Sequence, residues 1–167
     1  MIGTSSAASR EGSQEVCSLR VGGMLFAVPI ARVLEILGRP LLQPVPLAPE
    51  FFGGLVHYRG EVLAAISLRR LLGMDSAPSL EDVLVFESAQ RPFGLLVDSV
   101  GEVLSVSTAE HEPNPSTLDN RAQAVFAGAW KLADRLLITL DPDRLDPVRL
   151  ASALAESQKR SHARHAG

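Results

Sequence analysis

Residues 26–36 read FAVPIARVLEI, and residues 93–103 read FGLLVDSVGEV. A shift of 67 residues places the first stretch on the second and aligns phenylalanine with phenylalanine and glutamate with glutamate. A second shift, of 74 residues, places residues 52–71 on residues 126–145 and aligns glycine, arginine and apolar positions. The difference between the two shifts falls in a loop, where extra length costs little. The chain therefore contains an internal repeat, and a repeat decides the fold.

Both halves of the repeat consist of short segments with the period of β-strands. Cys17, Leu19 and Val21 alternate with polar residues, and Gly22-Gly23 then supplies a two-residue turn. Each half offers about five such segments, separated by turn signals, and this spacing is typical of a small barrel. We therefore expect a mainly β fold of two similar five-stranded barrels packed together, one dominated by each repeat.

The segment after the second repeat has the pattern of a helix. Asp146 is a good N-cap, Pro147 occupies the first helical position, and Leu150 and Leu154 lie four residues apart. We expect this C-terminal helix to pack on the barrels through the two leucines.

Composition at the two ends of the chain predicts the domain boundaries. Residues 1–14 are rich in Ser, Ala and Gly, and residues 157–167 are basic and carry no acid. We expect both segments to be disordered tails around a single domain of residues 15–156.

Charge and composition exclude several classes of protein. The net charge is −3 although the C-terminal tail is basic, so the domain itself is distinctly acidic, and only 5% of the residues are aromatic. These features argue against nucleic-acid binding and favour protein partners. The single cysteine, Cys17, excludes an internal disulfide and a Cys-rich metal site. The sequence shows no apolar run of ~18 residues and no secretion signal, so we expect a cytoplasmic protein without direct membrane insertion.

The residues that could catalyse a reaction are isolated in the sequence. His57 and His111 have no nucleophile or acid at a recognised spacing, and Asp98-Ser99 has no histidine beside it. His162 and His165 lie in the expected tail. We therefore predict no catalytic residue, no cofactor and no metal site. A small β-barrel hydrolase or ligand-binding enzyme is the alternative from another functional class.

Six segments follow one another in an order and spacing that resemble the CheW-like domain family. They are Ala27 to Ile30 running into Glu35-Ile36, the Pro-rich loop 38–50, Gly54 to Gly60, Glu61 to Leu63, Ser67 to Arg69, and Gly94 to Asp98. The resemblance covers roughly residues 15–155. It implies a fold of two five-stranded SH3-like barrels and a non-enzymatic adaptor of bacterial chemotaxis. The implied partners are the cytoplasmic tip of a methyl-accepting chemoreceptor and the regulatory domain of a CheA-type histidine kinase, in arrays peripheral to the inner membrane.

The resemblance also implies a receptor-binding surface. Val33 and Glu35 match the Val-x-Glu-Ile segment of the family, and Gly54, Arg59 and Gly60 match its Gly-x-x-Asn-Leu-Arg-Gly segment. We expect Glu35 and Arg59 on neighbouring strands of one barrel, with Glu35 orienting Arg59 at an interface. The alternative is an ordinary surface ion pair, which adds only ~0.2–1 kcal/mol to folding. We expect the kinase to bind an exposed apolar patch away from Arg59.

The chain departs from the family pattern at two places. His57-Tyr58 stands where Asn-Leu is common, and Ser67 stands where the family commonly has Asp. The loss of a carboxylate at Ser67 removes a possible anchor for a nearby arginine or turn amide. A divergent CheW-like scaffold that binds another receptor or regulator, without kinase coupling, is therefore the alternative function.

Overall fold

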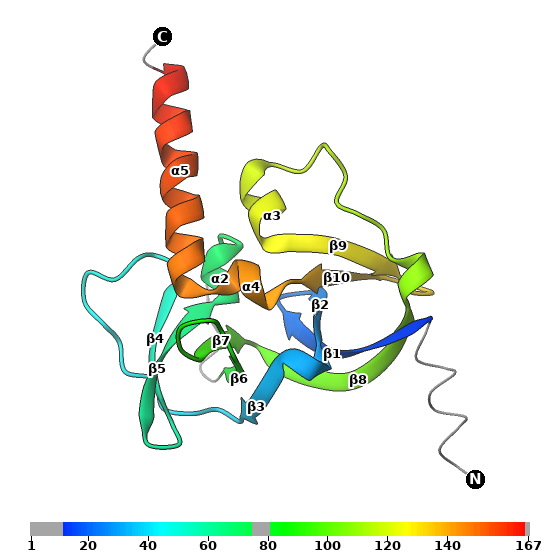
Figure 1. Cartoon of the computed structure of the whole chain (residues 1–167), viewed down its shortest axis with the longest axis horizontal. Coiled ribbons are helices and arrows are strands. Elements are labelled where there is room, and N and C mark those ends of the chain that lie inside the picture. Colours follow the sequence, from blue (N-terminus) through cyan, green and yellow to red (C-terminus); the bar gives the residue numbers. More distant parts are fainter. Residues whose placement is uncertain (1–11, 75–80, 166–167) are drawn as a thin grey trace.

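The computed structural model describes residues 12–74 and 81–165, which form ten strands, four helices and two 3₁₀ turns (Figure 1). The strands are β1 (Ser13–Val21), β2 (Met24–Pro29), β3 (Val33–Leu37), β4 (Phe52–Tyr58), β5 (Glu61–Ser67), β6 (Asp82–Phe86), β7 (Phe93–Val97), β8 (Ser99–Ser107), β9 (Phe126–Lys131) and β10 (Leu136–Leu140). The helices are α2 (Leu68–Leu71), α3 (Asn120–Val125), α4 (Pro142–Leu145) and α5 (Pro147–His165), and the 3₁₀ turns are η1 (Ile30–Arg32) and η2 (Thr108–Glu110).

The strands form two five-stranded sheets with the same topology. Sheet A has the order β8-β1-β2-β10-β9, and sheet B has the order β3-β6-β7-β5-β4. If β1 to β5 of the first repeat are matched with β6 to β10 of the second, the order of sheet A becomes that of sheet B. In both sheets the second strand of one repeat pairs in parallel with the last strand of the other. The expected mainly β fold and its internal repeat are confirmed.

The repeats exchange strands, which the sequence analysis did not anticipate. Each repeat supplies three strands of one sheet and sends its first hairpin, β1–β2 or β6–β7, to the other sheet. The expectation of one barrel dominated by each repeat therefore holds only for three strands out of five. The chain passes from sheet A to sheet B through η1 and returns between β7 and β8, at Asp98.

One backbone bridge brings the two edge strands of each sheet together. Just after β3, Gln43 exchanges two hydrogen bonds with Leu55 of β4, with N···O distances of 2.9 and 2.8 Å. In the loop after β8 and η2, Glu112 makes the equivalent exchange with Ala129 of β9, with both distances 2.9 Å. The two edges of each five-stranded sheet thus meet, and each sheet curls into a small barrel.

The core lies between the two sheets and is mostly aliphatic. Its largest cluster joins residues of both sheets to Leu145 of α4 and Leu150 of α5. Leu150 is buried and Leu154 packs against the same cluster, so the expected contact of the terminal helix is confirmed. Burial of a leucine side chain contributes about 1.5–3 kcal/mol, enough to fix the start of α5 on the barrels.

The terminal helix begins as expected but ends later. The Asp146 side chain accepts hydrogen bonds from the backbone N–H groups of Val148 and Arg149, at 3.0 and 3.4 Å. The helix continues to His165 and projects away from the sheets (Figure 1). Residues 157–165, expected to be a disordered tail, are thus helical, because residues such as Gln, Lys, Arg and Ala continue a helix that packing has started. Of the expected N-terminal tail, residues 1–11 lie outside the described residues, and Ser13 and Gln14 belong to β1.

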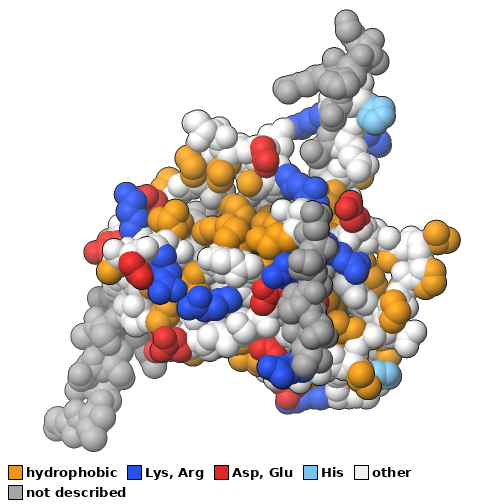
Figure 2. Space-filling view, turned by 180° about the vertical axis from the view of Figure 1, so that it is seen from behind, with side chains coloured by type: hydrophobic (Ala, Val, Ile, Leu, Met, Phe, Trp, Pro, Cys, Tyr) orange, Lys and Arg blue, Asp and Glu red, His pale blue; other side chains and the backbone are white. Residues whose placement is uncertain are grey.

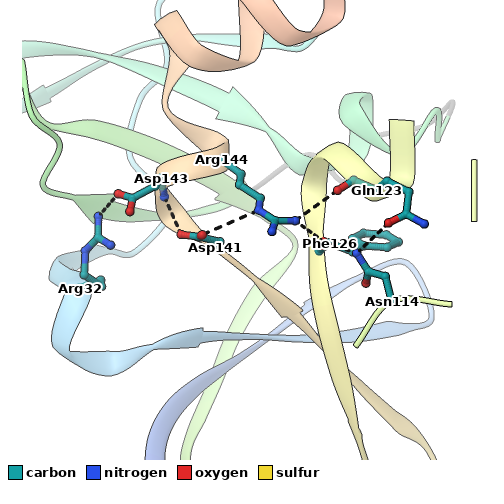
Figure 3. A network of polar contacts seen from close by, with 7 residues as sticks. All are labelled: Arg32, Asn114, Gln123, Phe126, Asp141, Asp143 and Arg144. Atoms are coloured by element: carbon teal, nitrogen blue, oxygen red, sulfur yellow. Dashed lines mark hydrogen bonds and ion pairs between the residues drawn. The ribbon is translucent and has the colours of Figure 1, made fainter. Parts of the chain in front are cut away.

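An arginine–aspartate pair stands at each passage between the sheets. Arg69, from α2, donates hydrogen bonds of 2.7 and 2.8 Å to the carboxylate of Asp98, at the passage from β7 to β8. Arg32, in η1, donates a hydrogen bond of 2.7 Å to Asp143 of α4 (Figure 3). The repeat matches Arg69 with Asp143 and places Arg32 on Ser99, one residue from Asp98, so the two pairs occupy nearly equivalent places with their charges exchanged. These hydrogen bonds hold the pKa of both carboxyl groups below its usual value.

A polar network continues from the Arg32–Asp143 pair to the start of strand β9 in sheet A (Figure 3). Arg144 donates to the carbonyl oxygens of Gln123 and Phe126, at 3.2 and 2.8 Å, and its Nε lies 3.8 Å from Asp141. Asn114 donates to the same Phe126 oxygen at 2.6 Å. The network ties α4 to α3 and to the start of β9. Neither of the two short helices, α3 and α4, was predicted from the sequence.

Candidate functional site

The hairpin between β4 and β5 turns on Arg59 and Gly60. Both residues have positive φ, 48° and 79°, as in a two-residue type I′ turn. Glycine adopts this conformation freely, whereas a residue with a Cβ atom is disfavoured there by about 1 kcal/mol. Gly60 is therefore required by the turn, and Arg59 is held in a strained conformation at the tip of the hairpin.

The fold does not demand this strain. The second repeat has Ala133 and Asp134 at the equivalent sequence positions, but there the strands end at Lys131 and resume at Leu136, so the connection is wider and neither residue has positive φ. It closes through a 2.8 Å hydrogen bond from Leu132 N–H to the Arg135 carbonyl oxygen. Because strained residues that the fold does not need concentrate at functional sites, Arg59 is the leading candidate in sheet B.

Glu35 and Arg59 lie together, as the sequence analysis expected. The Arg59 Nε atom is 3.6 Å from the Glu35 Oε2 atom, and their side chains are 74% and 39% exposed. The two strands are not hydrogen-bonded neighbours in a continuous ladder, however. Glu35 lies on β3 and Arg59 directly follows β4, and these two strands are the edges of sheet B that the Gln43 bridge brings together. At this distance and exposure the pair adds little to stability.

The His57-Tyr58 departure affects the same arginine. The Arg59 guanidinium carbon lies 5.4 Å from the centre of the Tyr58 ring, within the range of a cation–π contact. Tyr58 is half-buried and packs against the cluster that contains Val56 and Leu63, whereas His57 is exposed. The tyrosine thus supports Arg59 from one side while Glu35 attracts it from another.

The other predicted site residues have visible structural roles. Gly54 is buried with φ +139°, and a Cβ atom there would lie 2.9 Å from the Gln43 carbonyl oxygen, so glycine is needed for the barrel-closing bridge. Val33 is half-buried against the main core cluster, and Gly60 is exposed at the turn. The structure therefore brings Glu35, Arg59 and Gly60 to the surface, while Gly54 lies beneath it.

Ser67 still anchors a turn amide although it lacks a carboxylate. Its hydroxyl accepts a hydrogen bond from Arg70 N–H at 3.2 Å and caps α2. At the equivalent position Asp141 caps α4 and also approaches Arg144. Ser67 thus still caps the helix. What the missing carboxylate removes is only a possible ion-pair partner for an arginine side chain.

The strands that carry Glu35 and lead from Arg59 also expose apolar side chains. Leu34 and Ile36 of β3 are each 44% exposed, and Val62 of β5 is 45% exposed. These three residues could not be singled out from the sequence. Both faces of β3 carry apolar residues, so the sequence pattern does not indicate which face of the strand is exposed to solvent. An exposed arginine and exposed apolar side chains on one barrel are a common composition for a protein-binding surface.

The repeat places a second apolar pair on sheet A. Val103 corresponds to Ile36 and Leu136 to Val62, and they are 52% and 53% exposed. Glu102 corresponds to Glu35, but Ala133 stands where Arg59 would be. The two sheets therefore present similar apolar positions, and only sheet B adds an arginine.

The candidate catalytic groups are engaged elsewhere or lie apart. Asp98 is bound by Arg69, His111 shares a 3.0 Å hydrogen bond with Thr139, and His57 is exposed on β4. Across residues 12–74 and 81–165 no three His, Cys, Asp or Glu side chains gather as a metal site would require. None of the helices in those residues is both long and apolar enough to cross a membrane.

Comparisons with known proteins agree with these observations. The family model for the CheW-like domain matches residues 15–147. The chain is 31% identical over 138 residues to the chemotaxis protein CheW of Rhizobium meliloti (strain 1021), covering 81% of this chain and 89% of that protein. It is 32% identical over 119 residues to the protein FrzA of Myxococcus xanthus, covering 70% and 74%. The crystal structure of the scaffolding protein TtCheW from Thermoanaerobacter tengcongensis superposes with a TM-score of 0.69 at 23% identity, over 76% of this chain and 88% of that one.

Proposed function

Because this chain belongs to the CheW-like domain family, whose members are non-enzymatic scaffolds of chemotaxis, we propose that it couples a chemoreceptor to a CheA-type histidine kinase. The proposal places the protein in the cytoplasm, where it reaches the inner membrane only through the receptors. No substrate is converted, and the protein acts by holding two partners in a fixed arrangement.

The observation that carries the proposal is the strained and exposed Arg59. Its guanidinium lies close to Glu35 and Tyr58, and the same barrel carries the exposed apolar side chains of Leu34, Ile36 and Val62. An amphipathic helix with apolar side chains and a carboxylate would bury the three apolar residues and bind the arginine. The cytoplasmic tip of a methyl-accepting chemoreceptor, a helical hairpin in this family, has the required form.

The proposed kinase surface is the apolar pair on sheet A. Val103 and Leu136 are exposed and lie away from Arg59 on the other sheet. The regulatory domain of a CheA-type kinase has the same fold in this family, so its own barrel can cover this surface. Two partners would thus bind to the two equivalent sheets, with the arginine selecting the receptor.

A divergent scaffold is the second candidate. The residues beneath Arg59 depart from the family pattern, and one of the similar proteins, FrzA, is not named as a CheW. In this case the Arg59 surface would bind a receptor, while the sheet A surface would bind a regulator other than the kinase.

Co-purification of the full chain with its cognate receptor and CheA fragments tests the proposal. Binding of both fragments, separately and together, is the expected result. Binding of the receptor fragment alone would favour the divergent scaffold, and binding of neither would contradict both candidates.

A further inference from the structure

The loop between β3 and β4 exposes large apolar side chains. Leu41 is 94% exposed and Leu47 is fully exposed, in a stretch, residues 40–49, that contains no charged side chain. Figure 2 shows hydrophobic side chains standing out from the right-hand edge of the molecule, where this loop lies. Such exposure is costly in water, so it indicates a surface that a partner covers.

Leu47 is also strained. It has φ +62°, in a turn that follows Pro46. Glycine and asparagine tolerate this conformation, whereas a leucine side chain is disfavoured there. The chain therefore keeps a residue that is unfavourable both for its backbone and for its contact with water.

The second repeat serves as an internal control. In the described parts of the chain, three residues other than glycine have positive φ: Arg39, Leu47 and Arg59. All three lie between the end of β3 and the start of β5, and none lies in the equivalent segment between β8 and β10. The corresponding loop of the second repeat runs through η2 and α3 and makes the same barrel-closing bridge without such residues. A common function of Leu47 and Arg59 accounts for the strain at these two positions.

The loop is firmly held, so Leu47 is presented in a fixed place. The Gln43–Leu55 bridge fixes its first half, and Phe52 N–H donates to the Pro49 carbonyl oxygen at 2.9 Å at its end. Phe51 is buried in the main core cluster. A hollow of about 360 Å³ lies beside Leu47, with Phe52, Arg70 and Met74 among the residues that line it.

We propose that Leu47 is an apolar anchor for the same helical partner that binds at Arg59. This inference rests on the proposed receptor function and extends its surface along β4. The seven residues of β4 span about 20 Å from the loop to the hairpin, a length that about 14 residues of a helix cover. The partner helix therefore places apolar side chains against the uncharged loop. About 14 residues further along the helix, it places a carboxylate at Arg59.

The variant Leu47→Asn tests the inference because it should change stability and binding in opposite directions. Asparagine tolerates positive φ, so the melting temperature should stay the same or rise. Loss of the apolar side chain should weaken binding of the receptor's helical-hairpin fragment about 10-fold, as loss of an interface anchor does. The matched control is Arg39→Asn, which relieves the same kind of strain in the same loop without removing apolar surface and should leave binding unchanged.

The outcomes separate this inference from the proposed function. If Arg59→Glu weakens receptor binding but Leu47→Asn does not, the inference is overturned and the receptor function stands. If Leu47→Asn weakens binding of the kinase fragment instead, Leu47 serves another partner and the inference is also overturned. If neither variant changes receptor binding, the proposed function itself fails.

Discussion

Arg69 holds Asp98 through two hydrogen bonds, of 2.7 and 2.8 Å, at the point where the chain returns from sheet B to sheet A. The same carboxylate also accepts a 2.8 Å hydrogen bond from the backbone N–H of Gly22, in the turn between β1 and β2. The two side chains are only 16% and 19% exposed, so water screens the pair weakly. This aspartate therefore links α2, which follows β5 of sheet B, to the β1–β2 turn of sheet A.

Replacement of Asp98 with asparagine should destabilise the fold. Asp98→Asn removes the charge that Arg69 pairs with, and we expect the free energy of unfolding to fall by about 2 kcal/mol, because hydrogen bonds to charged groups contribute about 1.5–3 kcal/mol. Urea unfolding measures the change. The control is Asp134→Asn, whose exposed pair with Arg135 should contribute nothing measurable. Equal effects of the two variants would show that the Asp98 contact is not structural.

The same aspartates should make the protein sensitive to acid. The pKa of Asp98 is lowered by its hydrogen bond from Arg69, and that of Asp143 by its hydrogen bond from Arg32. Their contribution to stability is complete above the ordinary aspartate pKa, about 3.9, and is lost as the pH falls through the lower folded values. Unfolding measured from pH 7 down to pH 3 should show this loss. The Asp98→Asn variant should lose less stability over the same range, and an identical pH profile would contradict the assignment.

The exchange of hairpins between the repeats could not be predicted from the sequence. The repeat, the strands and the start of the helix follow from local patterns, such as the alternation around Leu19 or the Asp146 cap. Which sheet a hairpin joins depends on contacts far apart in the chain, such as those of β1 with β8. Two equivalent arrangements fit the same strand pattern, so periodicity cannot separate them.

Only part of the candidate site could be predicted from the sequence, because the rest depends on the three-dimensional geometry. Motif positions led to Glu35 and Arg59, and their contact was expected from opposite charge and the repeat. The strained backbone of Arg59 and Leu47 depends on turn geometry that ordinary residue types conceal, because arginine and leucine give no turn signal. Gly54 matched a motif, but its reason, the close approach of the Gln43 carbonyl oxygen, appears only when the barrel closes.

Closure of sheet B should depend on Gly54. In Gly54→Ala the new Cβ atom would lie 2.9 Å from the Gln43 carbonyl oxygen, on a backbone with φ +139°. We expect a loss of about 2 kcal/mol or more in the free energy of unfolding, since both strain and a backbone clash oppose the change. The control Gly23→Ala places its Cβ atom in open space and should be nearly neutral. Thermal melting compares the two, and a neutral Gly54→Ala would mean that the bridge is dispensable.

A charge on sheet A should separate kinase binding from receptor binding. Val103 is 52% exposed, so Val103→Asp should leave the fold intact. A buried carboxylate without a partner would oppose docking of an apolar surface, and we expect at least 10-fold weaker binding of the CheA fragment. Receptor-fragment binding should be unchanged in the same titrations. Weakened receptor binding with normal kinase binding would reverse the assignment of the two sheets.

Receptor-fragment binding by Arg59→Glu and Arg59→Ala, measured beside thermal melting, tests the central claim most directly. Arg59 is 74% exposed, so both variants should melt like the unaltered protein. Arg59→Glu should weaken binding by about 2 kcal/mol or more, roughly 30-fold in Kd. This loss should exceed that of Arg59→Ala, because the new acid faces Glu35. A large drop in melting temperature with unchanged receptor binding would contradict the account and show that Arg59 is a structural residue.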